Sequence, residues 1–220
     1  MGYNIAIDGP AGAGKSTIAK LVAKELGYIY VDTGAMYRGM AIYFLKQNIL
    51  SGDREKIAET CKDANVSIGY ENGVQQIYLN GENVTAMLRE EAVGNMASIS
   101  SAVPEVREQL LSLQRNLAEK ENVVMDGRDI GTNILPNADT KIYLTASVET
   151  RAKRRFLELQ EKGVDCNIEA IAQDIAERDS RDMNREIAPL RQAEDAMLID
   201  SSDMTIEEVV QAILSHCKSA

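Results

Sequence analysis

The sequence contains no tryptophan, and aromatic residues make up only 5% of it, so its core must be mostly aliphatic. The three cysteines, Cys61, Cys166 and Cys217, are widely separated and odd in number. They form neither a metal-ligand spacing nor a plausible disulfide framework, and we expect them to be reduced and structural. The single histidine, His216, lies near the C-terminus, which argues against a catalytic triad built on histidine.

The chain also lacks an excess of positive charge. It has 24 lysines and arginines against 34 aspartates and glutamates, for a formal net charge of -10. A binder of nucleic-acid polymers or of membrane surfaces needs a basic face, so both classes are disfavoured. The sequence shows no secretory pattern and no apolar run that could span a bilayer, so we expect a cytoplasmic protein. Any anionic ligand must be bound by basic residues gathered locally.

The order of the predicted elements indicates an α/β fold. Apolar runs of strand length alternate with stretches that have apolar residues at helical spacing. The strands are expected at 3–8, 28–31, 123–126, 141–147 and 196–202, and the helices at about 15–26, 34–47, 148–162, 167–182 and from 205 onward. This alternation favours a parallel β-sheet flanked by helices.

The middle of the chain departs from this alternation. A polar helix is predicted near residues 53–64, and two strand-like runs then follow, joined by "ENG", which is a hairpin signal. A helix at about 105–120 leads back to the next strand. We therefore expect an α+β insertion at about 51–120, within a core formed by residues 1–50, 121–147 and 190–220.

The stretch "GPAGAGKST" fits the phosphate-binding pattern G-x-x-x-x-G-K-[ST] at Gly9, Gly14, Lys15 and Ser16. Glycines let backbone N–H groups converge on phosphate oxygens, and the N-terminus of the following helix adds partial positive charge. Lys15 can contact the outer phosphates of a nucleotide, and the hydroxyl of Ser16 can bind Mg²⁺. A chance match in a turn is the alternative, but an apolar strand precedes the loop and an amphipathic helix follows it, as the motif requires.

The stretch "VVMDGRD" places Asp126 at the carboxyl end of a predicted buried strand, where ligands gather in open α/β sheets. Asp126 is therefore the candidate for the metal side of the site, mainly through water. The alternative is that it only caps the following turn. The guanine-binding pattern N-K-x-D is absent from the sequence, which disfavours a GTPase.

An apolar helical stripe over residues 168–175 continues into Arg178, Asp182 and Arg185. Charges on an inward face are costly unless they are paired or bound to a ligand, so these residues are site candidates. The alternative is a solvated helix end with surface salt bridges.

Arg107 lies in the first turn of its predicted helix, where a cation opposes the helix dipole. Recognition of an anion or a base would explain this placement. Simple exposure to solvent would explain it equally well.

The stretch "RAKRRFLELQEKG" supplies Arg151, Arg154 and Arg155 on one charged helix that ends in a glycine. It is typical of a mobile lid that closes over phosphates and excludes water. A surface helix with charge pairs such as Arg154 with Glu158 is the alternative.

Five stretches together resemble the bacterial cytidylate kinases, a branch of the nucleoside monophosphate kinase family. They are "IAIDGPAGAGKST", "VDTGAMYR", "MDGRDIGT", "RRFLELQEKG" and "ERDSRDMNREIAPL". They span nearly the whole chain, and the ordered set is far more specific than the glycine loop alone. The resemblance implies a P-loop NTPase-type fold in which the insertion is a monophosphate-binding domain and residues 148–168 form a helical lid.

The resemblance also implies an activity: ATP-dependent phosphorylation of CMP and dCMP to CDP and dCDP, with Mg²⁺ as cofactor. We expect a monomer that acts on these nucleotides. The implied ATP-binding residues are Gly9, Pro10, Ala11, Gly12, Ala13, Gly14, Lys15, Ser16 and Thr17. The implied CMP-binding residues are Thr33, Arg38 and Arg128 at the phosphate, Ser98, Arg107 and Asp129 at cytosine, Arg178 and Asp182 at the sugar, and Arg185 near the monophosphate. The catalytic cations would be Lys15, Arg128 and Arg185.

Two other functions stay open on the sequence. One is a P-loop kinase for another small phosphate acceptor, and the other is a regulatory ATP-binding module without turnover. No general base is evident, but none is required, because the phosphate of CMP is already an oxyanion nucleophile.

Overall fold

The computed structural model describes residues 2–219, which fall into two compact units. The core unit comprises residues 3–29 together with the chain from residue 122 onward, and the hairpin unit comprises residues 30–121 together with Gly2. No helix among the described residues is both long and apolar enough to cross a membrane.

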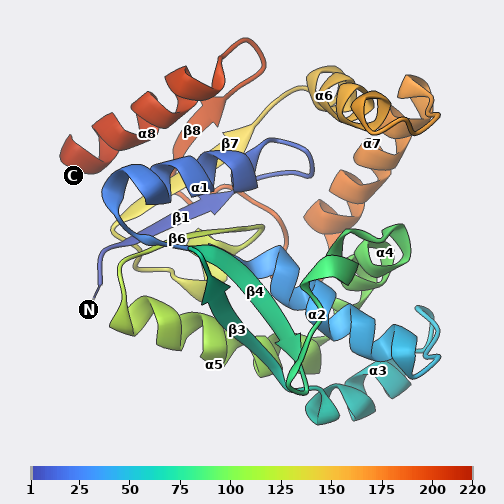
Figure 1. The fold of residues 1–220 in the computed structure, drawn as a ribbon. Helices are drawn as coiled ribbons and strands as arrows, with labels where there is room; N and C mark the ends of the chain where they lie inside the picture. Colours follow the sequence, from blue (N-terminus) through green and yellow to red (C-terminus); the bar gives the residue numbers. More distant parts are fainter. Residues whose placement is uncertain (1, 220) are drawn as a thin grey trace. The chain divides into compact units, whose positions relative to one another are not determined.

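Four parallel strands form the sheet of the core unit in the order β6-β1-β7-β8 (Figure 1). They are β1 (Asn4–Asp8), β6 (Val123–Gly127), β7 (Thr140–Thr145) and β8 (Met197–Asp200). Strand β2 (Ile29–Asp32) begins at the β6 edge, where the N–H of Ile29 donates to the carbonyl of Asn122 across 2.9 Å. The α/β fold with a parallel sheet is therefore confirmed.

The register of these strands brings their carboxyl ends to one edge of the sheet. Asp8, the last residue of β1, lies beside Gly127 of β6 and Tyr143 of β7. The residues before it in β1, Ile5 to Ile7, are fully buried, as expected for a parallel strand covered on both faces. The loops that follow β1 and β6 consequently start next to each other, at the edge where ligands bind in such sheets.

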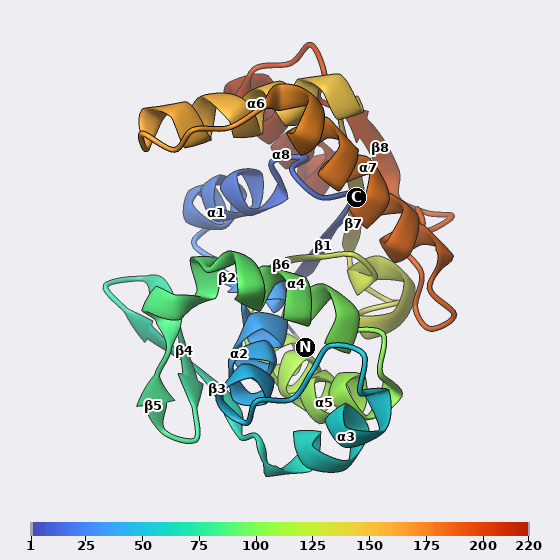
Figure 2. The same ribbon diagram turned by 90° about the vertical axis from the view of Figure 1, so that its right-hand side faces the viewer.

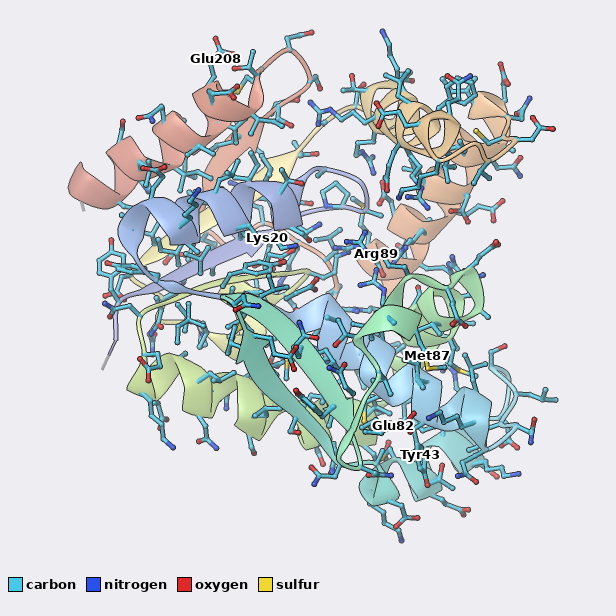
Figure 3. The ribbon with its side chains drawn as sticks, viewed as in Figure 1. Lys20, Tyr43, Glu82, Met87, Arg89 and Glu208 are labelled. Atoms are coloured by element: carbon cyan, nitrogen blue, oxygen red, sulfur yellow. The ribbon has the colours of Figure 1, made fainter. Side chains whose placement is uncertain are left out.

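Four helices belong to the core unit, namely α1 (Lys15–Leu26), α6 (Val148–Glu161), α7 (Ile168–Asn184) and α8 (Ile206–Ser219). Helix α1 buries Ile18 and Val22 and ends at Gly27, whose φ of 70° is the left-handed conformation that glycine adopts easily. Helices α6 and α7 pack side by side (Figures 1 and 2). Glu208, labelled in Figure 3, accepts the N–H of Thr205 across 2.8 Å, and the Thr205 hydroxyl accepts the N–H of Glu208. This capping box fixes the start of α8.

The hairpin unit contains a three-stranded antiparallel sheet in the order β3-β4-β5, with helices beside it (Figure 2). Its strands are β3 (Val66–Glu71), β4 (Val74–Leu79) and β5 (Glu82–Asn83). Its helices are α2 (Thr33–Lys46), α3 (Arg54–Thr60), α4 (Glu91–Ser100) and α5 (Pro104–Lys120), with 3₁₀ turns at Cys61–Asp63 and Thr85–Arg89. Helix α4 and strand β5 are additions to the predicted elements.

The turn between β3 and β4 explains the predicted hairpin. Asn72 and Gly73 have φ values of 51° and 76°, and two consecutive positive values are what a type I′ hairpin turn requires. Strand β4 also packs on α2, where a Cβ at Gly39 would lie 2.9 Å from Cγ2 of Ile77. Residues 30–50, which the sequence favours as part of the core, thus fold with the hairpin unit. The predicted functional limits of the insertion and the lid stay predictions.

Candidate active site

The loop between β1 and α1 is shaped so that only glycine fits its first position. Gly9 has a φ of 151°, and a Cβ there would lie 1.9 Å from the carbonyl oxygen of Leu144. Gly14 caps α1 in the left-handed conformation, with a φ of 86°, and the first turn of α1 holds no acidic residue. The positive end of the helix dipole and the loop N–H groups therefore favour an anion such as a phosphate.

Lys15 is buried at the start of α1, and its ammonium donates to the carbonyl of Pro10 across 2.7 Å. Burial lowers the pKa of Lys15, and the positive charge of Arg128 lowers it further, while the carboxylates of Asp126 and Asp8 oppose the shift. A bound phosphate would add negative charge beside this ammonium. The side chain is thus held where an anion stabilises its charged form.

Ser16 and Asp126 lie together at the carboxyl end of β6. The Ser16 hydroxyl donates to Oδ2 of Asp126 across 3.0 Å, and Asp126 is buried. Both offer the hard oxygen atoms that Mg²⁺ prefers, and Mg²⁺ commonly takes only one or two protein ligands beside substrate phosphates. The donor set fits the predicted metal.

Arg128, in the loop after β6, pairs with Asp182 on α7. Its Nε donates to Oδ2 of Asp182 across 2.8 Å. Burial alone would raise the pKa of Asp182, but the charge and hydrogen bond of Arg128, helped by the charges of Arg178 and Arg185, hold it below its ordinary value. Two residues assigned from the sequence to different parts of the acceptor, its phosphate and its sugar, are therefore direct neighbours.

Arg185, directly after α7, contacts the same loop. Its Nη2 donates to Oδ1 of Asp129 across 3.0 Å, and Nδ2 of Asn133 donates to Oδ2 of Asp129 across 3.1 Å. Asp129 is buried. Both oxygens of the carboxylate that was assigned to cytosine thus have protein partners.

The inward charged face of α7 is present as the sequence predicts. Ile175 is buried, and the stripe continues into the buried Asp182 and the half-buried Arg178. The alternative of a fully solvated helix end is therefore wrong. Asp179, also buried on this face, was not among the predicted residues.

The remaining predicted site residues belong to the hairpin unit and are Thr33, Arg38, Ser98 and Arg107. Arg107 is buried, its Nη1 donates to the carbonyl of Ser101 across 3.3 Å, and its guanidinium lies 5.7 Å from the ring centre of Tyr37. The alternative that Arg107 is merely exposed to solvent is therefore wrong. Thr33 is buried as the first residue of α2, Arg38 lies one turn further along it, and Ser98 lies on α4.

Asp8 is a further candidate site residue, which the predictions from the sequence do not include. Its carboxylate accepts the N–H groups of Ile130 and Gly131, each across 2.7 Å, and so fixes the π-helical turn Ile130–Ile134 that follows Arg128 and Asp129. Burial raises the pKa of Asp8 to about 6, although the two backbone hydrogen bonds oppose the shift. An acidic residue at the end of a buried strand, directly before the glycine loop, is the sequence signal that could have revealed it.

The arginines of α6 have different partners. Arg154 donates from Nη2 to the carbonyl of Ser201 across 2.6 Å, and from Nη1 to the Ser201 hydroxyl. Glu158 pairs with Arg155 and Lys162 instead of with Arg154, so the suggested Arg154–Glu158 pair is wrong. Arg154 instead ties α6 to the turn after β8.

Comparison with solved structures supports the fold. A gluconokinase from Sinorhizobium meliloti has a TM-score of 0.51 at 14% sequence identity, over 99% of this chain and 92% of that one. A protein from Eubacterium ventriosum has a TM-score of 0.54 at 15% identity, over the full length of both chains. These likenesses concern the fold alone.

Comparison of sequences is more specific. The family model described as cytidylate kinase matches residues 5–219. A protein named cytidylate kinase from Caldicellulosiruptor bescii is 54% identical, over 96% of this chain and 93% of its own. Another so named, from Bacillus subtilis, is 49% identical, over 96% and 94%. With a match over nearly its whole length and relatives this similar, the chain belongs to the cytidylate kinase family.

Proposed function

We propose that this protein transfers the γ-phosphoryl group of ATP to CMP and dCMP, forming ADP with CDP or dCDP. One observation carries the proposal most directly. The phosphate loop with Lys15 and the Arg128–Asp182 pair lie at the same edge of one sheet, close enough for Arg128 to lower the pKa of Lys15. A donor phosphate and an acceptor phosphate would both find cations there.

The chemistry requires positioning and charge neutralisation. An oxygen of the CMP phosphate attacks the γ-phosphorus of ATP, the bond to the bridging oxygen of ADP breaks, and no proton has to be removed from the nucleophile. Negative charge develops on the transferring oxygens, and Lys15, Arg128 and Arg185 are the cations assigned to stabilise it.

Magnesium is the metal for which the site is suited. Ser16 would supply its hydroxyl to Mg²⁺, and Asp126 would contact the metal mainly through water. When bound, the ion neutralises phosphate charge. The protein holds the hydroxyl of Ser16 and the carboxylate of Asp126 3.0 Å apart, at the end of β6.

Acceptor recognition is assigned to three groups of residues. Thr33, Arg38 and Arg128 bind the phosphate of CMP, Arg178 and Asp182 bind the sugar, and Ser98, Arg107 and Asp129 bind cytosine. The chemistry of Arg107 supports this assignment, because its guanidinium only donates hydrogen bonds and so matches the acceptors O2 and N3 of cytosine. Arg154 and Arg155 belong to a lid that closes over the phosphates. We propose a monomeric cytoplasmic enzyme.

A coupled assay of ADP release tests the proposal. Purified protein is given ATP and Mg²⁺ with CMP, dCMP, UMP, AMP and GMP, and separately with shikimate and gluconate as small non-nucleotide acceptors. The expected result is turnover with CMP and dCMP far above the others. Turnover only with another acceptor would support a different P-loop kinase, and ATP binding without turnover would support a regulatory module.

A further inference from the structure

We infer that Arg151 and Asp179 form a positioning pair that holds the phosphate loop in shape through the backbone of Ala11. The inference rests on the proposed function, because it concerns how the loop is held for the phosphates of ATP. Neither side chain is among the residues assigned to ATP or CMP, although Arg151 lies on the predicted lid helix.

The pair engages both polar groups of Ala11. Nη1 of Arg151 donates to the carbonyl oxygen of Ala11 across 2.8 Å, and the N–H of Ala11 donates to Oδ1 of Asp179 across 3.2 Å. The two side chains also meet directly, with Nη1 of Arg151 2.6 Å from Oδ2 of Asp179. Neither the carbonyl nor the N–H of Ala11 can turn without breaking one of these contacts.

The surroundings of Arg151 fix its own position. Its Nε donates to the carbonyl of Ala146, directly after β7, across 2.8 Å. Its aliphatic stem lies against the loop, because a Cβ at Gly12 would be 3.5 Å from Cβ of Arg151. The guanidinium is thus anchored to the sheet before it reaches the loop.

Burial argues that this pair serves more than stability. Arg151 is 4% exposed and Asp179 is 7% exposed. A buried ion pair recovers its desolvation cost only with good geometry and further hydrogen bonds, so it is weak evidence for stability by itself. Here the further hydrogen bonds go to one peptide of the phosphate loop and to the end of the neighbouring strand, so the pair specifies a loop conformation.

The placement of the two residues links the loop to the acceptor side. Arg151 lies in the first turn of α6, and Asp179 lies on α7, which also carries Arg178 and Asp182. A shift of α7 would therefore move Asp179 and disturb its hydrogen bond with the N–H of Ala11. Loss of the pair should impair the use of ATP more than that of CMP, because the direct contacts are to the phosphate loop assigned to ATP.

Steady-state kinetics with separately varied ATP and CMP test the inference in Arg151→Met and Asp179→Asn. Each variant keeps a side chain of similar length and removes a charge. We expect KM for ATP to rise by about 10- to 100-fold, as for the loss of one or two buried hydrogen bonds, with a much smaller change in KM for CMP. Equal increases in both KM values, or an unchanged KM for ATP, would overturn the inference.

Asp195→Asn is the matched control. Asp195 also pairs with a poorly exposed cation, Lys141, across 2.7 Å, but it has no contact with the phosphate loop. Its kinetic constants should stay within about twofold of the wild type, as for other changes away from the site. Thermal unfolding of each protein shows whether it is folded before the kinetics are compared.

The double variant Arg151→Asp with Asp179→Arg distinguishes two roles of the pair. One is to position the phosphate loop, and the other is only to hold α6 and α7 together by an ion pair. The swap restores opposite charges, but it turns arginine donors toward the N–H of Ala11 and carboxylate oxygens toward its carbonyl. We expect a folded protein whose KM for ATP stays raised, whereas recovery of that KM would overturn the inference. If the charge-removing variants and the swap all fail to fold while Asp195→Asn folds, the pair is structural and the inference is wrong. Absence of CMP phosphorylation by the wild type would instead count against the proposed function.

Discussion

Arg185 and Asp129 form a buried ion pair, 3.0 Å between Nη2 and Oδ1, which joins the end of α7 to the loop after β6. The carboxylate also accepts a hydrogen bond from Asn133. Asp129 can therefore act in two ways: it can accept the amino group of cytosine, or it can brace Arg185 near the transferring phosphate. The first role predicts that loss of Asp129 changes the ratio of kcat/KM for CMP to that for UMP. The second predicts lower activity with every acceptor and an unchanged ratio.

Base discrimination tests the assignment of Asp129, together with Ser98 and Arg107. Cytosine presents an amino donor beside two acceptors, whereas uracil presents a carbonyl and an N–H at the same places. Each buried group that loses its partner costs about 1–3 kcal/mol, so two mismatches should favour CMP over UMP by about 30-fold to more than 10⁴-fold. We expect Ser98→Ala, Arg107→Met and Asp129→Ala to reduce this preference, measured as the ratio of kcat/KM values.

Asn133→Ala is the control, because it removes a partner of Asp129 without removing the carboxylate. It should leave the ratio of CMP to UMP unchanged. If all three base-pocket variants keep the wild-type ratio, the assignment is wrong. If Asp129→Ala alone keeps the ratio but lowers activity with every acceptor, Asp129 only braces Arg185.

Much of the core could be predicted from the sequence, because its signals are local. The limits of α1 agree with the predicted residues 15–26, since apolar spacing marks the helix and Gly27 ends it. The hairpin follows from Asn72 and Gly73, whose backbone conformation few other pairs adopt as readily. The inward charges of α7 follow from periodicity alone.

Features that depend on distant contacts could not be predicted in this way. Helix α4 begins at Glu91 with no side-chain cap and contains Gly94, so its local helix signal is weak, and packing against α2 stabilises it. Asp8 and Asp179 are ordinary acidic residues in the sequence. They become candidate site residues only because folding places Gly131 and Ala11 against them, at separations of 123 and 168 residues along the chain.

Lys15 should be required for turnover and not for folding. Its ammonium is assigned to the negative charge that develops between the donor and acceptor phosphates, and Lys15→Met removes it while keeping an unbranched stem. We expect kcat to fall by about two to three powers of ten, as for the loss of other electrostatic stabilisers. The control is Lys20→Met, since Lys20 lies exposed on α1 (Figure 3) and should tolerate the change. Near-normal turnover in folded Lys15→Met would contradict the phosphate-loop assignment.

Residues 148–165 should become more protected when both substrate sites are filled. Their helix is tied to the turn after β8 by Arg154, while Arg155 and Glu158 pair near the surface. Closure over the phosphates would order these side chains and exclude water. Hydrogen exchange measured with and without a bisubstrate analogue should show slower exchange in this segment and little change in α8. Identical exchange in both states would argue against a lid.

Stability should depend on pH through Asp8. Burial raises the pKa of Asp8 from its ordinary value of 3.8 to about 6, so between these values the folded protein binds more protons than the unfolded chain. The free energy of unfolding contributed by Asp8 therefore falls as pH rises from about 4 to about 6, by about 3 kcal/mol in total. Asp8→Asn cannot titrate. Urea unfolding between pH 3 and pH 7.5 should show that the wild type loses stability relative to Asp8→Asn as pH rises from about 4 to about 6.

Asp195→Asn provides a control of opposite sign for this pH experiment. The hydrogen bond from Lys141 lowers the pKa of Asp195, so the stabilisation it provides is present above the ordinary pKa and is lost as pH falls. Relative to Asp195→Asn, the wild type should therefore gain stability as pH rises, by a small amount because Asp195 is exposed. If the two variants give opposite slopes, the loss of stability of the wild type with rising pH is assigned to the burial of Asp8. If the difference between the wild type and Asp8→Asn does not change with pH, the carboxyl of Asp8 titrates in the folded protein as it does in the unfolded chain, and the two N–H groups fully offset its burial.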